Sequence, residues 1–374
     1  MLYHAANSGF VPWIFYNNLN GGNMNKKLLT LAVGAALAGA VTVAQADVTV
    51  YGRAHVSLDK LDDGASTGGT DGTYVSSNSS RVGFKGDEDV GGGLKAVWQV
   101  ESLVRLDGGT GAGLSQTAGN AWANRNSFVG LAGGFGTAVL GRHDTPFKLI
   151  GRAVDLFNEQ VGDSRNIISE GSGATWDLRP NNVVAYISPS LGGVTVIAAR
   201  VPDEGGANTD ATSISAQASF GSLWVGVAME NHGAGITTEP KDEEGQRLGV
   251  KWSAGDLTVA GLIQRTDKNA GIDANKRGSE GVGVSYKFGN NTVKAQYYRA
   301  GKLKSTADTN GAMQAVGFDH AFSKRTTVYA AYATASNKGA FSTFKADTGG
   351  HGDTVGAAAG KSPKAISFGM VHDF

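Results

Sequence analysis

The sequence predicts an all-β protein that forms a transmembrane antiparallel β-barrel of about 16 strands. Apolar and polar residues alternate through many short segments, and short turns alternate with long loops along the chain. After residue 46 no run approaches the ~18 apolar residues that indicate a helical membrane span. An even number of tilted antiparallel strands, with short turns at one rim and long loops at the other, is typical of bacterial outer-membrane barrels.

The alternation has a period of two, which is the period of a β-strand. In the segment 47–59 the apolar side chains Val48, Val50, Ala54, Val56 and Leu58 share one face, opposite Thr49, Tyr51, Arg53, His55 and Ser57. The same pattern returns in 213–220, 247–253 and 281–288. Lipid must meet the apolar face, because a charge there would cost ~2–4 kcal/mol at the midplane. The charged face is therefore expected to line a water-filled lumen.

Turn length supports a barrel rather than a β-sandwich. Seven short turns separate eight long polar loops, so the connections join 16 strands. The loops are expected at about 60–78, 107–123, 144–180, 202–210, 231–245, 266–278, 301–311 and 337–363. A soluble sandwich would also show alternating strands, but it gives no reason for turn length to alternate so regularly.

The last eleven residues, Lys364 to Phe374, give the clearest strand signal. Ile366, Phe368, Met370, His372 and Phe374 share one face of this segment. Aromatic residues anchor membrane proteins at the interface, so Phe374 is expected to end the strand that closes the barrel against the first.

Residues 24–46 have the features of a cleaved signal peptide. A basic start at Met24-Asn25-Lys26-Lys27 precedes sixteen apolar residues and then Ala44-Gln45-Ala46. A membrane anchor is the alternative, but the stretch is shorter than the ~20 residues of a spanning helix. We expect residues 1–23 to be a start-site artefact, with a genuine extension as the alternative, and residues 47–374 to form the barrel.

Composition excludes several functions. Residues 1–46 contain two lysines and no acid, so 31 basic and 33 acidic side chains remain after cleavage. This balance offers no electrostatic basis for nucleic-acid binding. The chain has no cysteine, which excludes disulfides, thiolate nucleophiles and cysteine-ligated metals. The 56 glycines suit many tight turns and close strand packing.

Enzyme chemistry is not indicated. The sequence contains no G-x-G-x-x-G and no H-E-x-x-H, and Val355 occupies the first glycine position of a phosphate-loop lookalike that ends at Lys361-Ser362. A hydrolase triad using His143 and Asp144 is conceivable, but nothing fixes a serine beside them. The acids in 59–63 could bind a divalent cation, although solvated surface acids are the simpler interpretation. No catalytic residue, metal or cofactor is therefore expected.

Several motifs resemble the Gram-negative general porins of the neisserial and β-proteobacterial branch. They are Val48-Thr-Val-Tyr-Gly52, the run from Ser80 to Asp89, Asn126 to Leu131, Phe135-Gly136, Gly141 to Pro146, Asn181 to Tyr186 and the final Phe374. Each is weak alone, and together they extend from Asp47 to the end. The resemblance implies a homotrimer of sixteen-stranded barrels that passes small hydrophilic solutes and ions passively across the bacterial outer membrane. Outer-membrane lipid and lipopolysaccharide are then the expected surroundings.

The resemblance also implies that the long third loop, from Asp144 to about Pro180, folds into the lumen. An acidic loop facing a basic wall would set a transverse field and control ion selectivity. The expected acids are Asp155, Glu159, Asp163, Glu170 and Asp177, and the expected basic wall is Arg53, Arg81, Lys95, Arg125 and Arg142. Strict alternation would turn Arg142 outward, so it must lie at a strand end or after a bulge.

Two other functions stay open at this point. The chain could be a surface adhesin or receptor whose long loops bind a partner, with any pore plugged. It could also be a substrate-specific channel, although neither an aromatic track for sugars nor a dense basic cluster for phosphate stands out. Solute preference does not follow from the sequence.

Overall fold

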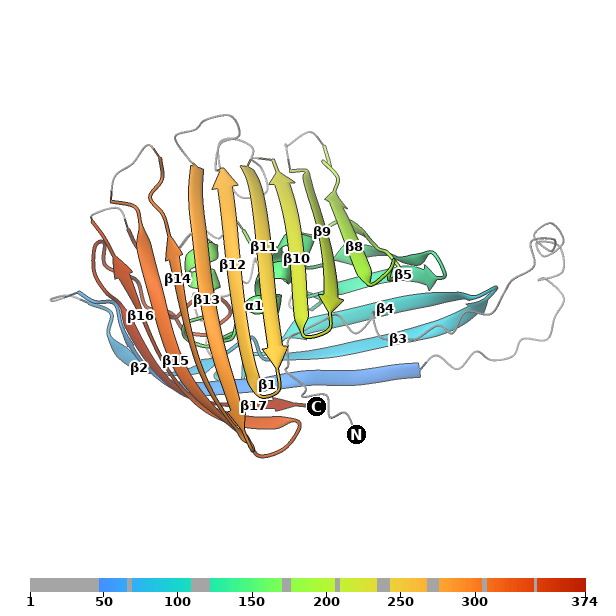
Figure 1. Cartoon of the computed structure of the whole chain (residues 1–374). Helices are drawn as coiled ribbons and strands as arrows, with labels where there is room; N and C mark the ends of the chain where they lie inside the picture. The colour runs from blue at the N-terminus through green and yellow to red at the C-terminus, as the bar shows by residue number, and fades with distance from the viewer. Residues whose placement is uncertain are drawn as a thin grey trace.

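The computed structural model describes residues 47–65, 69–108, 122–169, 176–205, 209–233, 243–267, 276–304, 308–339 and 342–374. The expected signal peptide and the residues before it lie outside this part. The described residues contain seventeen strands and two helices (Figure 1). Neither helix has the length and apolar character that crossing a membrane requires.

The first nine strands are β1 (Asp47–Asp62), β2 (Gly72–Ser77), β3 (Arg81–Gly91), β4 (Leu94–Leu103), β5 (Ser127–Gly133), β6 (Gly136–Arg142), β7 (Val183–Ile187), β8 (Val194–Val201) and β9 (Ala211–Phe220). The others are β10 (Leu223–His232), β11 (Glu243–Ala254), β12 (Leu257–Asp267), β13 (Lys276–Phe288), β14 (Asn291–Ala300), β15 (Gly311–Ala321), β16 (Thr326–Asn337) and β17 (Lys364–Asp373). The helices α1 (Pro146–Val154) and α2 (Arg165–Ile168) both lie between β6 and β7.

The strands form one closed antiparallel ring. From β3 onward each strand pairs with the next, and β17 pairs with β1 in the register Arg53↔Asp373 to Asp62↔Lys364. Both β2 and β3 pair with β1, at its two ends, so they are two parts of one barrel strand. The ring therefore has sixteen strand positions. The predicted sixteen-stranded antiparallel barrel is confirmed.

Side-chain hydrogen bonds stabilise the break between β2 and β3. Ser79 has a positive φ of 52°, which interrupts the ladder at Asn78–Ser80. Ser80 Oγ accepts a hydrogen bond from His55 N at 3.0 Å and donates one to His55 O at 2.9 Å, and His55 O also accepts one from Asn78 N at 2.8 Å. The predicted first loop, 60–78, was too long because β1 continues to Asp62 and β2 begins at Gly72.

The two faces of the barrel have opposite chemistry. Val48, Val50, Leu140, Ile263 and Phe368 lie on the outer face and are 54–60% exposed. The polar residues that alternate with them point inward and are mostly buried, as Ser213 and Ser215 of β9 are. A soluble protein would expose the polar face. An exposed apolar ring that leaves no backbone edge unpaired is what lipid requires.

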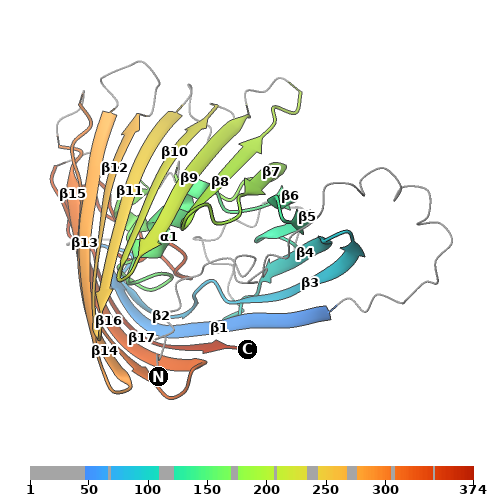
Figure 2. The ribbon, with the colours of Figure 1, turned by 45° about the vertical axis from the view of Figure 1, so that its right-hand side comes forward.

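The short turns that join β9 to β10, β11 to β12 and β13 to β14 lie at the same rim of the barrel (Figure 1 and Figure 2). The turn Gly221–Ser222, for example, joins β9 to β10 and uses the positive φ of Gly221, 59°, which glycine adopts without strain. Two long connections matter below. We call residues 143–182 the third loop and residues 342–363 the last loop.

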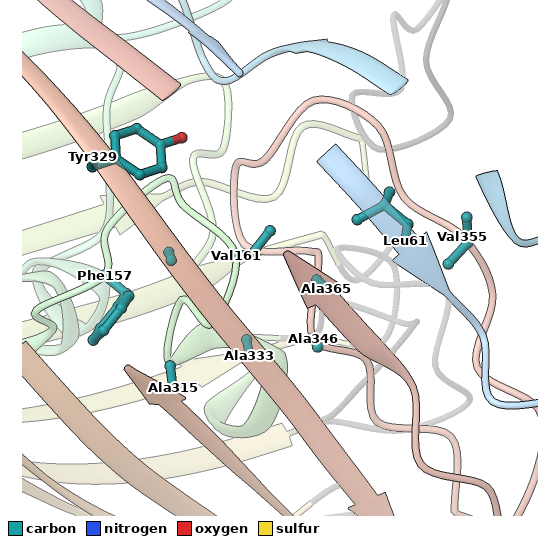
Figure 3. Close-up of a cluster of buried hydrophobic side chains, with 10 residues drawn as sticks. Leu61, Phe157, Val161, Ala315, Tyr329, Ala333, Ala346, Val355 and Ala365 are labelled. Atoms are coloured by element: carbon teal, nitrogen blue, oxygen red, sulfur yellow. The ribbon is translucent and has the colours of Figure 1, made fainter. Parts of the chain in front are cut away.

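A buried apolar cluster joins both of these loops to the barrel wall. Phe157 and Val161 of the third loop and Ala346 and Val355 of the last loop pack with Leu61 of β1. Figure 3 shows them beside Ala315, Tyr329, Ala333 and Ala365, which come from β15, β16 and β17. The two loops are therefore packed parts of the fold rather than free connections.

Candidate functional site

The third loop contains the helix α1, and the sequence explains where this helix begins. Thr145 caps α1 because its Oγ1 accepts a hydrogen bond from Lys148 N at 3.3 Å, and Pro146 occupies the first turn, where its missing N–H costs nothing. Ile150 and Val154 lie on one face of α1 and are buried against Gly249 of β11. An added Cβ at Gly249 would lie 3.1 Å from the Ile150 side chain, so any larger residue there would have to displace Ile150 slightly.

The first and last residues of the third loop are bound to each other. Asp144 Oδ1 lies 2.8 Å from Lys148 Nζ and 3.0 Å from Arg179 Nε, and Thr145 N donates to Leu178 O at 3.1 Å. Burial would raise the pKa of Asp144, but the two cations hold that pKa well below the usual range. The beginning and the end of the loop are thus held together by a buried, charged carboxylate.

Strands β11 and β14 bind one side of the third loop. Arg247 of β11 is buried and makes a bidentate pair with Asp177, with Nη1–Oδ1 2.6 Å and Nη2–Oδ2 3.2 Å. Its Nη1 also donates to Phe147 O at 2.9 Å. On β14, Gln296 Nε2 donates to Asp155 Oδ1 at 3.0 Å and Lys294 Nζ donates to Gln160 Oε1 at 2.9 Å.

Glu159 is bound by arginines from the other side of the barrel. Its Oε1 lies 2.9 Å from Arg81 Nη1 on β3, and its Oε2 lies 3.3 Å from Arg53 Nη1 on β1. Arg152 Nη2 of α1 is 3.3 Å away and Arg125 Nη2 is 3.9 Å away. Glu159 has a positive φ of 64°, a strained conformation that these contacts hold in place.

The charge state of Glu159 follows from these neighbours. Burial alone would raise its pKa, because Glu159 is only 1% exposed. The four guanidiniums outweigh burial and hold the pKa well below that of an ordinary glutamate. Glu159 is therefore an ionised carboxylate at neutral pH.

A second carboxylate completes this cluster. Glu101 of β4 accepts a hydrogen bond from Arg125 Nε at 2.6 Å and from the Tyr51 hydroxyl at 3.0 Å, and lies 4.0 Å from Arg81 Nε. Asp373 pairs with Arg53 at 2.7 Å nearer the solvent. We call Arg53, Arg81, Arg125, Arg152, Glu101 and Glu159 the arginine cluster. Its four guanidiniums and two carboxylates lie close together, with Arg53, Arg81 and Glu101 on barrel strands and Arg152 and Glu159 on the third loop.

The other predicted loop acids have structural contacts instead. Asp155 is 8% exposed and accepts hydrogen bonds from Phe157 N and Ser164 N. Asp163 is fully buried and makes a bidentate pair with Arg165 at 2.7 and 3.0 Å. Asp177 pairs with Arg247, as described above. Glu170 lies outside the described residues.

The predicted wall residues divide into two groups. Arg53, Arg81 and Arg125 come together around Glu159. Lys95 does not join them: it lies beside the turn that starts β4 and pairs with Asp87 at 2.6 Å. Arg142 is the last residue of β6, at the strand end that its sequence position required, and its guanidinium bonds Asn124 O and Asn181.

Phe374 exchanges two backbone hydrogen bonds with Gly52, at 2.9 and 3.1 Å, directly beyond the β1–β17 ladder. Its ring covers Gly52, where an added Cβ would lie 2.3 Å from Cζ. The glycine therefore lets the terminal aromatic side chain lie across the first strand.

Two residues of the arginine cluster were missed from the sequence. Glu101 alternates in phase with Lys95 and Gln99 on β4, so the strand period alone assigns it to the inner face. Arg152 lies in the last turn of α1, where a cation also suits the helix dipole. Its approach to Glu159 depends on the path of residues 155–158, which no local pattern specifies.

One group of carboxylates among the described residues could approach a cation. Ligand oxygens of Asp62, Asp63 and Asp71 lie within 4.8 Å of one another. Asp63 already accepts backbone N–H groups of Ala65 and Thr70 at 2.8 and 2.9 Å. These contacts explain its position without an ion.

Known proteins are similar to this chain in sequence and in fold. Residues 30–340 match the family described as Gram-negative porin. Outer membrane porin protein 32 of Delftia acidovorans is 30% identical over 370 residues, which cover 94% of this chain and 100% of that protein. The major outer membrane protein P.IB of Neisseria lactamica is 29% identical over 323 residues, covering 81% of this chain and 91% of that one.

Solved structures agree with these matches. The anion-selective porin from Comamonas acidovorans superimposes with a TM-score of 0.75 at 26% identity, covering 88% of this chain and all of that one. The trimer form of OmpT, an outer membrane protein of Vibrio cholerae, has a TM-score of 0.64 at 18% identity over 88% of this chain and 99% of that one. The second similarity concerns the fold alone.

Proposed function

Because the chain belongs to the Gram-negative porin family and is an outer-membrane diffusion channel, we propose that its third loop folds into the lumen and narrows the pore at the arginine cluster. Porins are channels rather than enzymes, and we propose passive transport of small hydrophilic solutes and ions without catalysis. The geometry around Glu159 is the observation that carries the constriction.

The supporting argument is that one loop is bound from both sides of a closed ring. Glu159 takes its partners from β1 and β3, whereas Asp177 and Asp155 take theirs from β11 and β14. Inward-pointing side chains on separated strands can reach one segment only if it crosses the interior. A loop in that position reduces the cross-section available to ions.

We also propose a preference for anions at this constriction. Even if Asp373 is included, three carboxylates meet four guanidiniums, which leaves one surplus positive charge among these described residues. Arg152 is the partly accessible member contributed by the loop itself, at 12% side-chain exposure. The related Comamonas protein is described as anion-selective, which agrees with this balance.

Reversal potentials in a planar bilayer under a potassium chloride gradient test the proposal. Arg152→Gln removes the surplus charge and should lower the anion-to-cation permeability ratio roughly twofold, since a ring of charges sets selectivity. Lys95→Gln removes the same charge beside a turn, away from Glu159, and should change the ratio less. Equal ratios for the wild-type protein and Arg152→Gln would exclude the cluster as the selectivity element.

We propose a homotrimer whose contact surface includes the outer faces of β1, β2 and β15–β17. A groove of about 620 Å³ on these strands is lined by apolar side chains, among them Leu58, Val75, Phe318, Phe368 and Met370. A second copy would fill it with side chains, while lipid and lipopolysaccharide would cover the remaining outer face. The mass of the detergent-solubilised protein decides this: three chains per particle are expected, and a single chain would contradict it.

We further propose that residues 24–46 are removed on export and that residues 1–23 are not part of the working protein. The basic start and the Ala44-Gln45-Ala46 triplet support this proposal. Sequencing of the mature N-terminus should begin at Asp47, and any earlier residue would contradict it.

A further inference from the structure

The last loop touches the same region of the pore as the third loop. Gly162 N donates to Ala346 O at 2.7 Å, and Thr348 N donates to Asn166 Oδ1 at 2.9 Å. A Cβ added at Gly350 would lie 2.9 Å from Arg165 Nη2 and 3.4 Å from the Glu159 side chain. The backbone of the last loop therefore passes in contact range of the arginine cluster.

The break between β2 and β3 gives the last loop a docking place. Ser79 Oγ donates to Gly350 O at 2.8 Å, and Gly352 N donates to Asn78 Oδ1 at 2.8 Å. Both strand groups are side-chain atoms, so they can bond the last loop while Asn78 N still donates to His55 O of β1 at 2.8 Å. The interruption at Asn78–Ser80 thus supplies hydrogen bonds to residues about 270 positions later in the chain.

His351 lies at the centre of this docking and is 1% exposed. Its Nε2 is 3.1 Å from Asp59 Oδ2 on β1, and its Nδ1 is 2.6 Å from Asp353 O. A carboxylate and a carbonyl both accept hydrogen bonds and cannot donate them. Only the imidazolium form has both the positive charge that the ion pair with Asp59 needs and a proton on Nδ1 for Asp353 O.

We propose that the protonated His351–Asp59 pair holds the last loop against the inner wall beside Glu159, so that this loop forms a second side of the constriction and is released when His351 loses its proton. Loss of one ring proton leaves a nitrogen lone pair facing an acceptor, which breaks either the contact to β1 or the turn at Asp353. The inference rests on the proposed constriction and adds a second loop and a pH dependence to it.

The groups facing His351 make this pair sensitive to pH in one direction. Asp59 and His55 come from β1 and Asp347 from the last loop, and the hydroxyls of Ser76 on β2 and Ser367 on β17 bond Asp59 from its other sides. Burial lowers the pKa of His351, but the hydrogen bond and charge of Asp59 outweigh burial, so its pKa is raised above the ordinary value. The stabilisation is therefore complete below about pH 6.5 and is lost as the pH rises through the raised pKa.

Single-channel conductance between about pH 6 and about pH 9 tests the inference, because this interval brackets a raised histidine pKa. The wild-type conductance should rise roughly 1.5- to 2-fold with pH as the last loop leaves the constriction. His351→Gln cannot form the ion pair, so it should have the high conductance already at about pH 6 and little pH dependence. His372→Gln, the same change at a β17 histidine that bonds Thr326, should retain the wild-type profile.

A disulfide supplies a second measurement in a chain without cysteines. Asn166→Cys combined with Thr348→Cys joins the two loops where their side chains already bond each other. Oxidation should suppress the alkaline rise, and a reductant should restore it.

The wild-type pH profile retained in His351→Gln would overturn the inference, as would an alkaline rise that survives oxidation of the cysteine pair. If Arg152→Gln still changes the permeability ratio in that case, the third-loop constriction stands and only the role of the last loop fails. If Arg152→Gln also has no effect, the arginine cluster fails as the selectivity element as well.

Discussion

The two walls that bind the third loop do so by different physical means. The wall formed by β1, β3 and the residues before β5 contributes guanidiniums that surround one carboxylate, Glu159. The wall formed by β10–β12 contributes glycines and apolar side chains that pack on α1, with one buried ion pair, Arg247–Asp177. The comparison separates two roles in the proposed pore: the wall formed by β10–β12 holds the loop through apolar packing and the Arg247–Asp177 pair, and the arginine cluster supplies the charge of the proposed constriction.

The largest expected effect on the stability of the third loop comes from breaking the Arg247–Asp177 ion pair at the wall formed by β10–β12. Arg247→Met leaves Asp177 buried without its partner, which costs about 3–5 kcal/mol. The third loop should detach from β11, and hydrogen exchange of the amides in α1 should accelerate accordingly. Arg299→Met, which removes an exposed pair with Glu280 on the outer face, is the matched control and should leave α1 protected. Equal exchange in the two variants would show that Arg247 does not hold the loop.

A smaller effect is expected from crowding the helix contact. Gly249→Val places a side chain where even a Cβ meets Ile150 at 3.1 Å and Val154 at 3.2 Å, an overpacking cost of about 1–3 kcal/mol. The same exchange measurement should show faster opening of α1, and selectivity should change less than in Arg152→Gln, because all four guanidiniums of the arginine cluster remain. Gly278→Val, at a β13 glycine with no atom within 4 Å, controls for valine itself. A selectivity change as large as that of Arg152→Gln would contradict the separation of the two walls.

The sequence predicted the barrel well because the information is local and repetitive. Alternation assigns each strand residue to the lipid or the lumen, and Phe374, at the end of the strongest alternating segment, does pair with the first strand. The split at Ser79 was not predictable, because it depends on hydrogen bonds to Gly350 and Gly352 across the interior. The loop 60–78 was therefore drawn too long.

The candidate site was only partly predictable, because contacts between segments far apart in the chain determine it. Arg53, Arg81 and Glu159 were selected by face and charge sign, and these criteria cannot tell which acid of a polar loop meets the cations. Asp155, Asp163 and Asp177 share that sign, yet their carboxylates stabilise the loop or bind Arg247. Lys95 lies on the predicted inner face of β4, but at the turn end of this strand, away from Glu159. Arg152 was missed because a helix and a turn, folded together, bring it to Glu159.

Thiol modification at Arg152 tests most directly whether the third loop narrows the pore at the arginine cluster. The chain contains no cysteine, so Arg152→Cys provides a single reactive site, and Arg325→Cys at the exposed turn before β16 is the control. A bulky anionic thiol reagent should lower the single-channel conductance of Arg152→Cys by roughly half, because it occupies the narrowest cross-section, and should leave Arg325→Cys unchanged. Complete labelling of Arg152→Cys with an unaltered conductance would contradict the account.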